Sequence, residues 1–327
     1  MTHWWSRLRP DNFTLALLAT VLLASLLPMK GAAAMVLDDV TTVAIAALFF
    51  LHGARLPREA ILGGLTHWRL HVVILACTFV LFPLLGLLFF PLKGWLLTPE
   101  LYMGVLFLCA LPSTVQSSIA FTSIAHGNVP AAVCSASLSS ILGVFLTPLL
   151  LTALAGTSGG IHNPLQAVGG IVLQLLVPFV AGHLLRPWIA GWVERQRGLL
   201  RYTDQATILL VVYSAFGESV NEGLWSKTPL ISLLTVAVVA AVLLGIAMPL
   251  ITLIARKLRF NREDEIAIVF CGSKKSLATG VPIAKVLFAG GSLGAIVLPV
   301  MIYHQIQLIV CGVIAQRYAR KVAPPAP

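Results

Sequence analysis

The sequence predicts an all-α polytopic membrane protein with ten transmembrane helices. Hydrophobic residues make up 58% of the 327 residues, charged residues make up only 10%, and the mean hydropathy is +0.93. A soluble domain of this size needs a more highly charged surface than these residues supply. The apolar residues also occur in stretches of roughly 17–25, which is the length that crosses a bilayer as a helix.

The ten apolar stretches follow one another along the chain. They lie at residues 12–28, 38–54, 70–91, 101–125, 129–155, 164–185, 205–221, 230–254, 266–288 and 293–316. The first also fits a signal peptide, because Arg7 and Arg9 precede an apolar core and Ala32–Ala34 resembles a cleavage site. Removing this stretch would leave an odd number of spans, so we interpret it as a membrane helix.

The loops between the stretches indicate the orientation. With the N-terminus inside, 16 of the 22 Lys and Arg residues fall in inner segments and three in outer loops. The remaining three, Lys274, Lys275 and Lys285, lie within the ninth stretch. This distribution follows the positive-inside rule, so we expect a multi-pass protein of the inner (plasma) membrane with both termini cytoplasmic. The same distribution explains the net charge of +10. We therefore expect membrane lipid, and not nucleic acid, as a partner.

The two halves of the chain resemble each other. The segment Gln116–Ala120 aligns with Lys274–Ala278, and Phe82–Leu84 aligns with Met248–Leu250. We therefore predict two five-helix repeats, residues 1–158 and 159–327. Because five is an odd number, the two repeats insert with opposite orientations, which makes an inverted repeat.

The fourth and ninth stretches are predicted to be broken helices. Pro112 cannot continue a regular helix without freeing backbone groups, and Gly272-Ser273 is a similar weak point. Freed backbone groups are tolerated at membrane depth only where they are buried in protein or line a polar cavity. A matched pair of broken helices is typical of a transporter's binding site. Kinks that serve packing alone are the alternative.

Two adjacent lysines lie at the second break, where a lysine costs about 2.5–3.5 kcal/mol on insertion scales. Neither Asp nor Glu occurs inside the predicted hydrophobic core, so helix-end carbonyls, hydroxyls, water or a bound anion must compensate their charge. An intramembrane histidine on the tenth stretch is either a packing residue or a group for proton coupling. The candidate site residues are Lys274, Lys275, Ser276, Gln116, Ser117, Ser118, Ser135, Ser139, His304 and Gln305.

Other classes of site find little support in the sequence. All five cysteines fall within apolar stretches, and no spacing of Cys and His is typical of zinc. No nucleophile–base pair appears either. We therefore expect no metal, no cofactor and no enzymatic activity.

The broken fourth and ninth helices resemble those of the bile acid:sodium symporter family. The similarity covers the whole chain and includes "FPLLG" in the third stretch, "LPSTVQSS" and "AHGNVPAA" in the fourth and fifth, and the glycine-containing break in the ninth. The resemblance implies a panel domain and a core domain interleaved between the repeats. In the core domain the two broken helices cross, with sodium and substrate sites around the crossing.

Several sodium ligands that the resemblance implies are replaced in this chain. Phe270 stands where family members place a carboxylate, Lys274 where they place glutamine, and Lys275 where asparagine is usual. Thr78 replaces a third-span glutamine. The segments "FCGSKKSLATG", "FFLHGARL" and "YHQIQL" resemble the lysine-bearing branch of the family, which includes relatives of its seventh human member.

Other implied ligands keep a suitable side chain. Ser117 and Ser118 match the serine/asparagine ligand pair of the fourth helix. Ser135 or Ser139 replaces a fifth-helix hydroxyl, because the aligned residue is Ala136. Losing a carboxylate and gaining two cations does not favour sodium, which needs oxygen ligands.

Two functions from different classes fit these observations. The first is a secondary transporter that works by alternating access on a small organic anion. One lysine would act as a built-in cation, as a ligand of the anion or as a proton-titrating group, so proton coupling stays open and sodium coupling is not favoured. We expect Lys275 to replace sodium and Lys274 to face the cavity. The second is a membrane regulatory or scaffold protein that keeps the fold and no longer transports.

Overall fold

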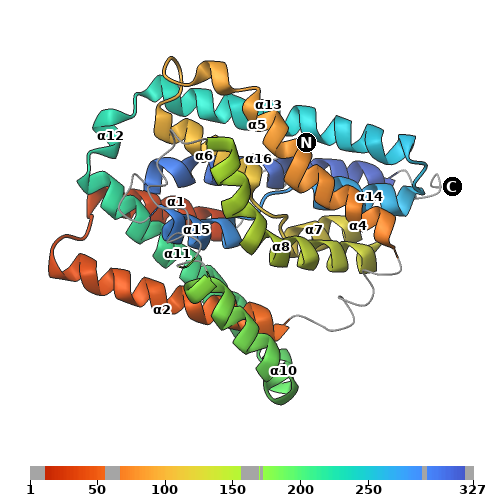
Figure 1. Cartoon of the computed structure of the whole chain (residues 1–327), viewed down its shortest axis with the longest axis horizontal. Helices are drawn as coiled ribbons and strands as arrows, with labels where there is room; N and C mark the ends of the chain where they lie inside the picture. Colours follow the sequence, from red (N-terminus) through yellow and green to blue (C-terminus); the bar gives the residue numbers. More distant parts are fainter. Residues whose placement is uncertain (1–11, 56–66, 156–168, 170–171, 289–292, 321–327) are drawn as a thin grey trace, which may run out of the picture. The chain divides into compact units, whose positions relative to one another are not determined.

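The computed structural model describes residues 12–55, 67–155, 169, 172–288 and 293–320. These residues form helices joined by turns and short loops, as Figure 1 shows. They group into two compact units, each of which draws on both halves of the chain. Unit 1 takes the described residues of Met1–Arg55, Asn163–Pro229 and Val281–Ala295, and unit 2 takes those of Leu56–His162, Leu230–Gly280 and Ile296–Pro327.

Unit 1 contains four long helices, of which α2 packs on α10 and α1 packs on α11. Its elements are α1 (Asn12–Leu26), α2 (Ala32–Arg55), a π-helical turn η4 (Val172–Leu176), α10 (Val177–Arg195), α11 (Arg197–Asn221) and the short α12 (Leu224–Lys227).

Two glycines bring α2 and α10 into backbone contact, and Figure 1 shows the two helices crossing. A Cβ atom added at Gly53 would lie 1.9 Å from the Phe179 carbonyl oxygen, and one added at Gly182 would lie 1.9 Å from the Phe50 carbonyl oxygen. Small residues at helix contacts of this kind let backbones approach closely in a membrane. This contact therefore depends on the absence of side chains at both positions.

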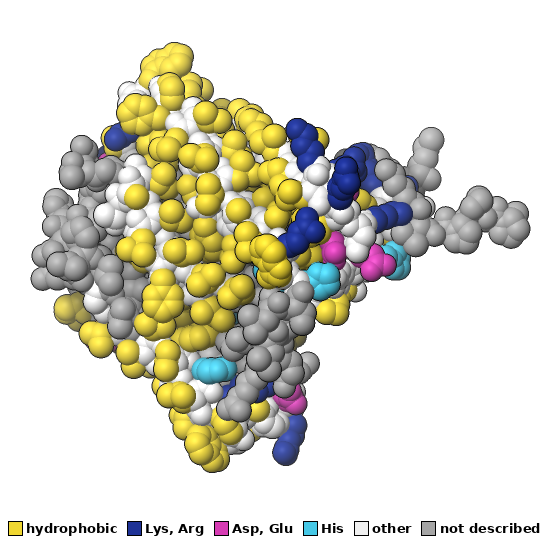
Figure 2. All heavy atoms as spheres, turned by 45° about the vertical axis from the view of Figure 1, so that its right-hand side comes forward, with side chains coloured by type: hydrophobic (Ala, Val, Ile, Leu, Met, Phe, Trp, Pro, Cys, Tyr) yellow, Lys and Arg dark blue, Asp and Glu magenta, His cyan; other side chains and the backbone are white. Residues whose placement is uncertain are grey.

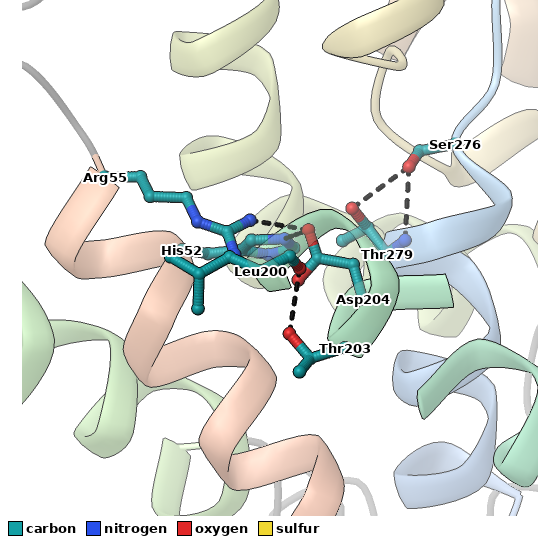
Figure 3. Close-up of polar contacts among 7 residues, drawn as sticks. All are labelled: His52, Arg55, Leu200, Thr203, Asp204, Ser276 and Thr279. Atoms are coloured by element: carbon teal, nitrogen blue, oxygen red, sulfur yellow. Dashed lines mark hydrogen bonds and ion pairs between the residues drawn. The ribbon is translucent and has the colours of Figure 1, made fainter. Parts of the chain in front are cut away.

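A charged cluster joins α2 to α11 within unit 1. The Arg55 guanidinium donates to Asp204 Oδ2 at 2.5 Å, and His52 Nε2 lies 4.0 Å from the same oxygen, as Figure 3 shows. Asp204 is buried, so this ion pair compensates a carboxylate that would be costly alone.

Unit 2 holds both of the predicted breaks. Its elements are α4 (Trp68–Ala76), a π-helical turn η2 (Cys77–Leu81), α5 (Phe82–Leu87), a 3₁₀ turn η3 (Phe90–Leu92), α6 (Pro99–Ala110), α7 (Gln116–Ile124), α8 (Val129–Ala155), α13 (Leu230–Lys257), α14 (Arg262–Gly272), α15 (Leu277–Leu287) and α16 (Leu293–Arg320). The last two helices each continue into unit 1.

Seven helical segments of the described residues are long and apolar enough to cross a membrane, so the chain is a polytopic membrane protein. They are Ala32–Arg55, Trp68–Leu87, Val129–Leu154, Leu173–Arg195, Leu230–Lys257, Arg262–Leu287 and Leu293–Arg320. Figure 2 shows hydrophobic side chains spread over the middle of the visible face, as lipid contact requires, and Lys and Arg side chains gathered toward its right-hand side.

The structure therefore meets the predicted fold in part. The first and fourth predicted spans contain shorter apolar helices, Leu15–Leu26 and Pro99–Ala110. The fourth is short because the chain leaves the helix after Ala110 and resumes at Gln116. The seventh predicted span lies in α11, which also carries Asp204 and Glu218 and is not among the seven apolar segments.

We predict that Gly182→Ala destabilises the protein, because the new methyl group would press on the Phe50 carbonyl and force α2 and α10 apart. Overpacking of this kind costs about 1–3 kcal/mol. Gly191→Ala on the same helix is the matched control, since its nearest neighbour is the flexible Arg195 guanidinium at 3.9 Å. Scanning fluorimetry in detergent should show a lower melting temperature for Gly182→Ala only. Equal melting temperatures for both variants would contradict the contact.

Candidate functional site

The two predicted breaks lie side by side in unit 2 and bond to each other. Ser276 N donates to the Pro112 carbonyl at 2.9 Å, and Ser113 Oγ donates to the Cys271 carbonyl at 2.6 Å. Ser118 Oγ also donates to the Phe270 carbonyl at 3.2 Å. Each break therefore satisfies backbone groups that the other exposes, as buried polar groups require.

Side chains of α8 satisfy further backbone groups around the first break. Ser139 Oγ accepts from Ser113 N at 3.0 Å, and Thr147 Oγ1 donates to the Ala110 carbonyl at 2.9 Å. These bonds hold the chain extended where Pro112 prevents an α-helix.

Side chains of α16 support the second break. Tyr303 Oη donates to the Ser273 carbonyl at 2.7 Å. The Gln307 amide bonds to both backbone groups of Lys275, accepting from its nitrogen at 2.9 Å and donating to its oxygen at 3.0 Å. At the start of α15, Ser276 Oγ accepts from Thr279 N at 3.1 Å and caps the helix, as Figure 3 shows. The break is thus an ordered element with its own hydrogen bonds.

The Lys275 ammonium lies in a cage of three carbonyl oxygens. Its Nζ donates to the carbonyls of Thr78, Cys109 and Leu111 at 2.7, 2.8 and 2.8 Å. The face of the Phe82 ring lies 4.4 Å from the same nitrogen. An ammonium group has three donors, so all of them are used. Although Lys275 is only 1% exposed, its charge is compensated.

The Thr78 carbonyl is free because of the π-helical turn that precedes Pro83. In an α-helix this carbonyl would accept from Phe82 N, but that nitrogen donates to the Cys77 carbonyl. The next residue is Pro83, which has no N–H to offer. The turn therefore leaves the Thr78 oxygen available for the lysine.

The other two oxygens are free because of the first break. In a continuous helix the Cys109 carbonyl would accept from Ser113 N, which is instead bonded to Ser139. The Leu111 carbonyl lies beyond the end of α6, where the chain is extended. The cage thus combines one π-helical turn with one broken helix.

Lys274, the adjacent lysine, has a different environment. It is fully buried, and its Nζ has no hydrogen-bond partner among the described residues. Its Nζ lies over the Phe121 ring, 3.7 Å from the ring centroid, and 5.8 Å from the centroid of Phe270. When the amine is protonated, these contacts are cation–π interactions.

Several predicted residues lie at the crossing of the two breaks, although not all in the expected way. Ser118, Ser139 and Ser276 bond across or within the breaks. Thr78 contributes its backbone carbonyl, because its hydroxyl donates to the Ile74 carbonyl at 2.8 Å. The two lysines lie within the second break, between the end of α14 at Gly272 and the start of α15 at Leu277.

Other predicted residues lie apart from the lysines. Gln116 is exposed in the first turn of α7, so it does not occupy the position of Lys274 relative to its helix. Ser117 bonds to Thr114 at 2.7 Å, and Ser135 bonds to His71 Nδ1 at 2.7 Å.

On α16, His304 and Gln305 are half-buried, and His304 Nδ1 lies 2.9 Å from Gln307 Nε2. His304 is therefore linked to Lys275 through this amide. Our prediction omitted Gln307, Phe121 and the carbonyls of Cys109 and Leu111. Gln307 lies one helical turn after Tyr303 and His304, which is a signal that could have identified it.

Comparison with known proteins agrees with the resemblance seen in the sequence. Residues 11–320 match the model of the SBF-like CPA transporter family. An uncharacterized protein of Pseudomonas aeruginosa is 63% identical over 96% of this chain and 95% of its own length. The Escherichia coli protein YfeH, whose name proposes that it is a symporter, is 55% identical over 95% and 93%. The sodium/bile acid cotransporter 7-B of Xenopus laevis is 29% identical over 94% and 91%.

We predict that Lys275→Met destabilises the protein much more than Lys274→Met. The first change leaves three buried carbonyls without a donor, and breaking a buried charged network typically costs about 3–5 kcal/mol. The second removes an ammonium that has no hydrogen-bond acceptor among the described residues, so the melting temperature should stay the same or rise. Scanning fluorimetry of both variants in detergent measures the difference. A reversed order, or two equal decreases, would show that the roles are wrongly assigned.

Proposed function

Because the chain belongs to the SBF-like CPA transporter family, we propose that it is a secondary transporter of organic anions that works by alternating access without sodium. The Lys275 ammonium takes the place of the sodium ion. The observation that carries this proposal is the cage of three carbonyl oxygens around its Nζ. Carbonyl oxygens are also the kind of ligand that a hard cation uses.

The fixed ammonium also works against a second cation. Two unit charges about 4 Å apart repel each other by about 4 kcal/mol at an effective dielectric constant of 20. In the described part of the site, Phe270 and Lys274 bring no carboxylate that would offset this repulsion. Sodium is therefore disfavoured beside Lys275.

The anionic substrate is supported by charge and by a relative. The names of the Xenopus laevis relatives contain bile acid, which is an organic anion. In this chain the buried charges at the breaks are the two lysines, Lys274 and Lys275. A substrate of opposite sign would complement them.

We extend the proposal to ten membrane segments in an inverted repeat of residues 1–158 and 159–327. The two breaks, at Leu111–Val115 and Ser273–Ser276, support it, because each ends one short helix and begins another. Each compact unit also takes helices from both halves of the chain, which suits interleaved panel and core domains.

The orientation is supported by charges at one end of unit 2. Arg69 donates to the Leu258 carbonyl at 3.3 Å, and Arg262 donates to the Tyr318 carbonyl at 2.8 Å, so basic helix ends gather there. This end faces the cytoplasm of a bacterial plasma membrane in our proposal, with both chain termini on that side.

Alkaline phosphatase fused to the C-terminus should be inactive and green fluorescent protein fused there should fluoresce. The opposite pair of results would reverse the orientation.

Transport is tested with the purified full chain in proteoliposomes. We expect saturable uptake of taurocholate, or of another member of a panel of radiolabelled carboxylates and sulfonates, at the same rate in Na⁺ and in K⁺. Lys274→Met should abolish this uptake while the protein stays folded. Gly191→Ala serves as a folded control that keeps its uptake.

Two results would contradict the proposal. Uptake that requires Na⁺, or a melting temperature that rises in Na⁺ relative to K⁺ at equal ionic strength, would reveal a sodium site that ligand binding stabilises. Absence of uptake for the whole panel, with a folded protein, would favour a regulatory or scaffold role instead.

A further inference from the structure

Lys274 and Lys275 are neighbours in the chain, but their ammonium groups have opposite requirements. All three donors of Lys275 are used by carbonyl oxygens. Lys274 is equally buried and has no acceptor among the described residues. Its charge therefore needs a partner that the described part of the chain does not supply.

The groups around Lys274 suit a neutral amine better than an ammonium ion. Its neighbours are the rings of Phe121 and Phe270 and the thiols of Cys271 and Cys311. A desolvated cation–π contact is worth about 2 kcal/mol. Burying a charge costs several kcal/mol even after relaxation. The rings therefore offset only part of the cost of the positive charge.

The other titratable groups on the elements around Lys274 are engaged elsewhere. Cys271 Sγ donates to the Ala132 carbonyl at 3.8 Å, and Cys134 lies half-buried on α8. Other described groups have partners of their own: His71 with Ser135, His304 with Gln307, Tyr303 with the Ser273 carbonyl, Cys311 with Ser273, Asp264 with Asn128, Arg262 with the Tyr318 carbonyl, and Arg256 and Tyr318 with Glu265. None of these described groups gives Lys274 a counter-charge.

We propose that Lys274 binds a proton and the anionic group of the substrate together, so that the chain carries one proton with each anion. This inference rests on the proposed transport of organic anions and names its coupling ion. In the empty site the side chain is a neutral amine. On loading, the nitrogen lone pair takes a proton from water on the entry side, and the resulting ammonium donates hydrogen bonds to the anion. On the other side the anion leaves and the proton returns to water.

The linkage follows from mutual stabilisation. The proton creates the charge that holds the anion, and the anion supplies the acceptor that the ammonium lacks. By linkage each raises the affinity of the site for the other by the same factor. For a monoanion the loaded site adds no net charge, so transport of the pair is electroneutral.

The test measures proton uptake when an anion binds to the purified full chain. The probes are taurocholate and thiocyanate, which both stay ionised from slightly acidic to slightly alkaline pH. Isothermal titration calorimetry in two buffers of different ionisation enthalpy gives the number of protons taken up per bound anion. We expect up to about one proton for the unmodified protein, and none for Lys274→Arg, because a guanidinium is always charged.

Lys285→Arg is the matched control. Lys285 is an intramembrane lysine of unit 1 that bonds to Asp38 and to Ser214, so exchanging its cation should leave the proton uptake unchanged. Three results would overturn the proposal: neither probe binds, a probe binds without proton uptake, or Lys274→Arg takes up protons as the unmodified protein does.

A separate measurement distinguishes failure of this proposal from failure of the transport function. In proteoliposomes, an inward proton gradient should drive uptake into vesicles of the unmodified protein and should not affect Lys274→Arg. Sodium-independent uptake that ignores the proton gradient would leave the transporter in place and remove the coupling. Proton uptake on anion binding without any transport would support the linkage at Lys274 and contradict the transport function.

Discussion

The structure of unit 2 depends on a single buried ammonium group. Lys275 joins the π-helical turn before α5, the end of α6 and the break between α14 and α15. Its three donors reach one carbonyl of the π-helical turn and two at the end of α6, and its own backbone lies in the break. Without a cation there, three carbonyls would point at one another in a medium of low dielectric constant. The interruptions that free these carbonyls and the Lys275 charge that they bind therefore depend on each other.

The sequence was enough to locate the breaks but not the atoms that meet there. Pro112 and Gly272-Ser273 mark the ends of α6 and α14, because proline and glycine act on the backbone directly. The ligands of Lys275 are backbone carbonyls, which every residue carries, so no side-chain pattern announces them. Thr78 likewise takes part through its backbone carbonyl, which its side chain does not reveal. We aligned Gln116 with Lys274 because the residues that follow them are similar. In the structure Gln116 begins α7, whereas Lys274 precedes the first residue of α15.

The two lysines show how neighbours in sequence can take separate roles once the helix is interrupted. In the ordered break, Lys275 turns toward α4 to α6, and Lys274 lies against the Phe121 ring of α7. All three donors of Lys275 have acceptors, whereas Lys274 Nζ has none among the described residues. In our proposal a fixed cation and an adjustable one therefore occupy adjacent positions, in a break that the bonds to Gln307 and Tyr303 hold in place.

The π-helical turn at Cys77–Leu81 places one more residue in a helical turn than an α-helix holds. In genetic terms, it is equivalent to a one-codon insertion in the middle of a membrane helix. Deleting one of the residues between Thr78 and Phe82 would let α4 run on as a regular helix and rotate the Phe82 face by about 100° relative to Thr78. The side of the cage that this helix supplies, the Thr78 carbonyl and the Phe82 ring, thus depends on the smallest length change that a reading frame allows.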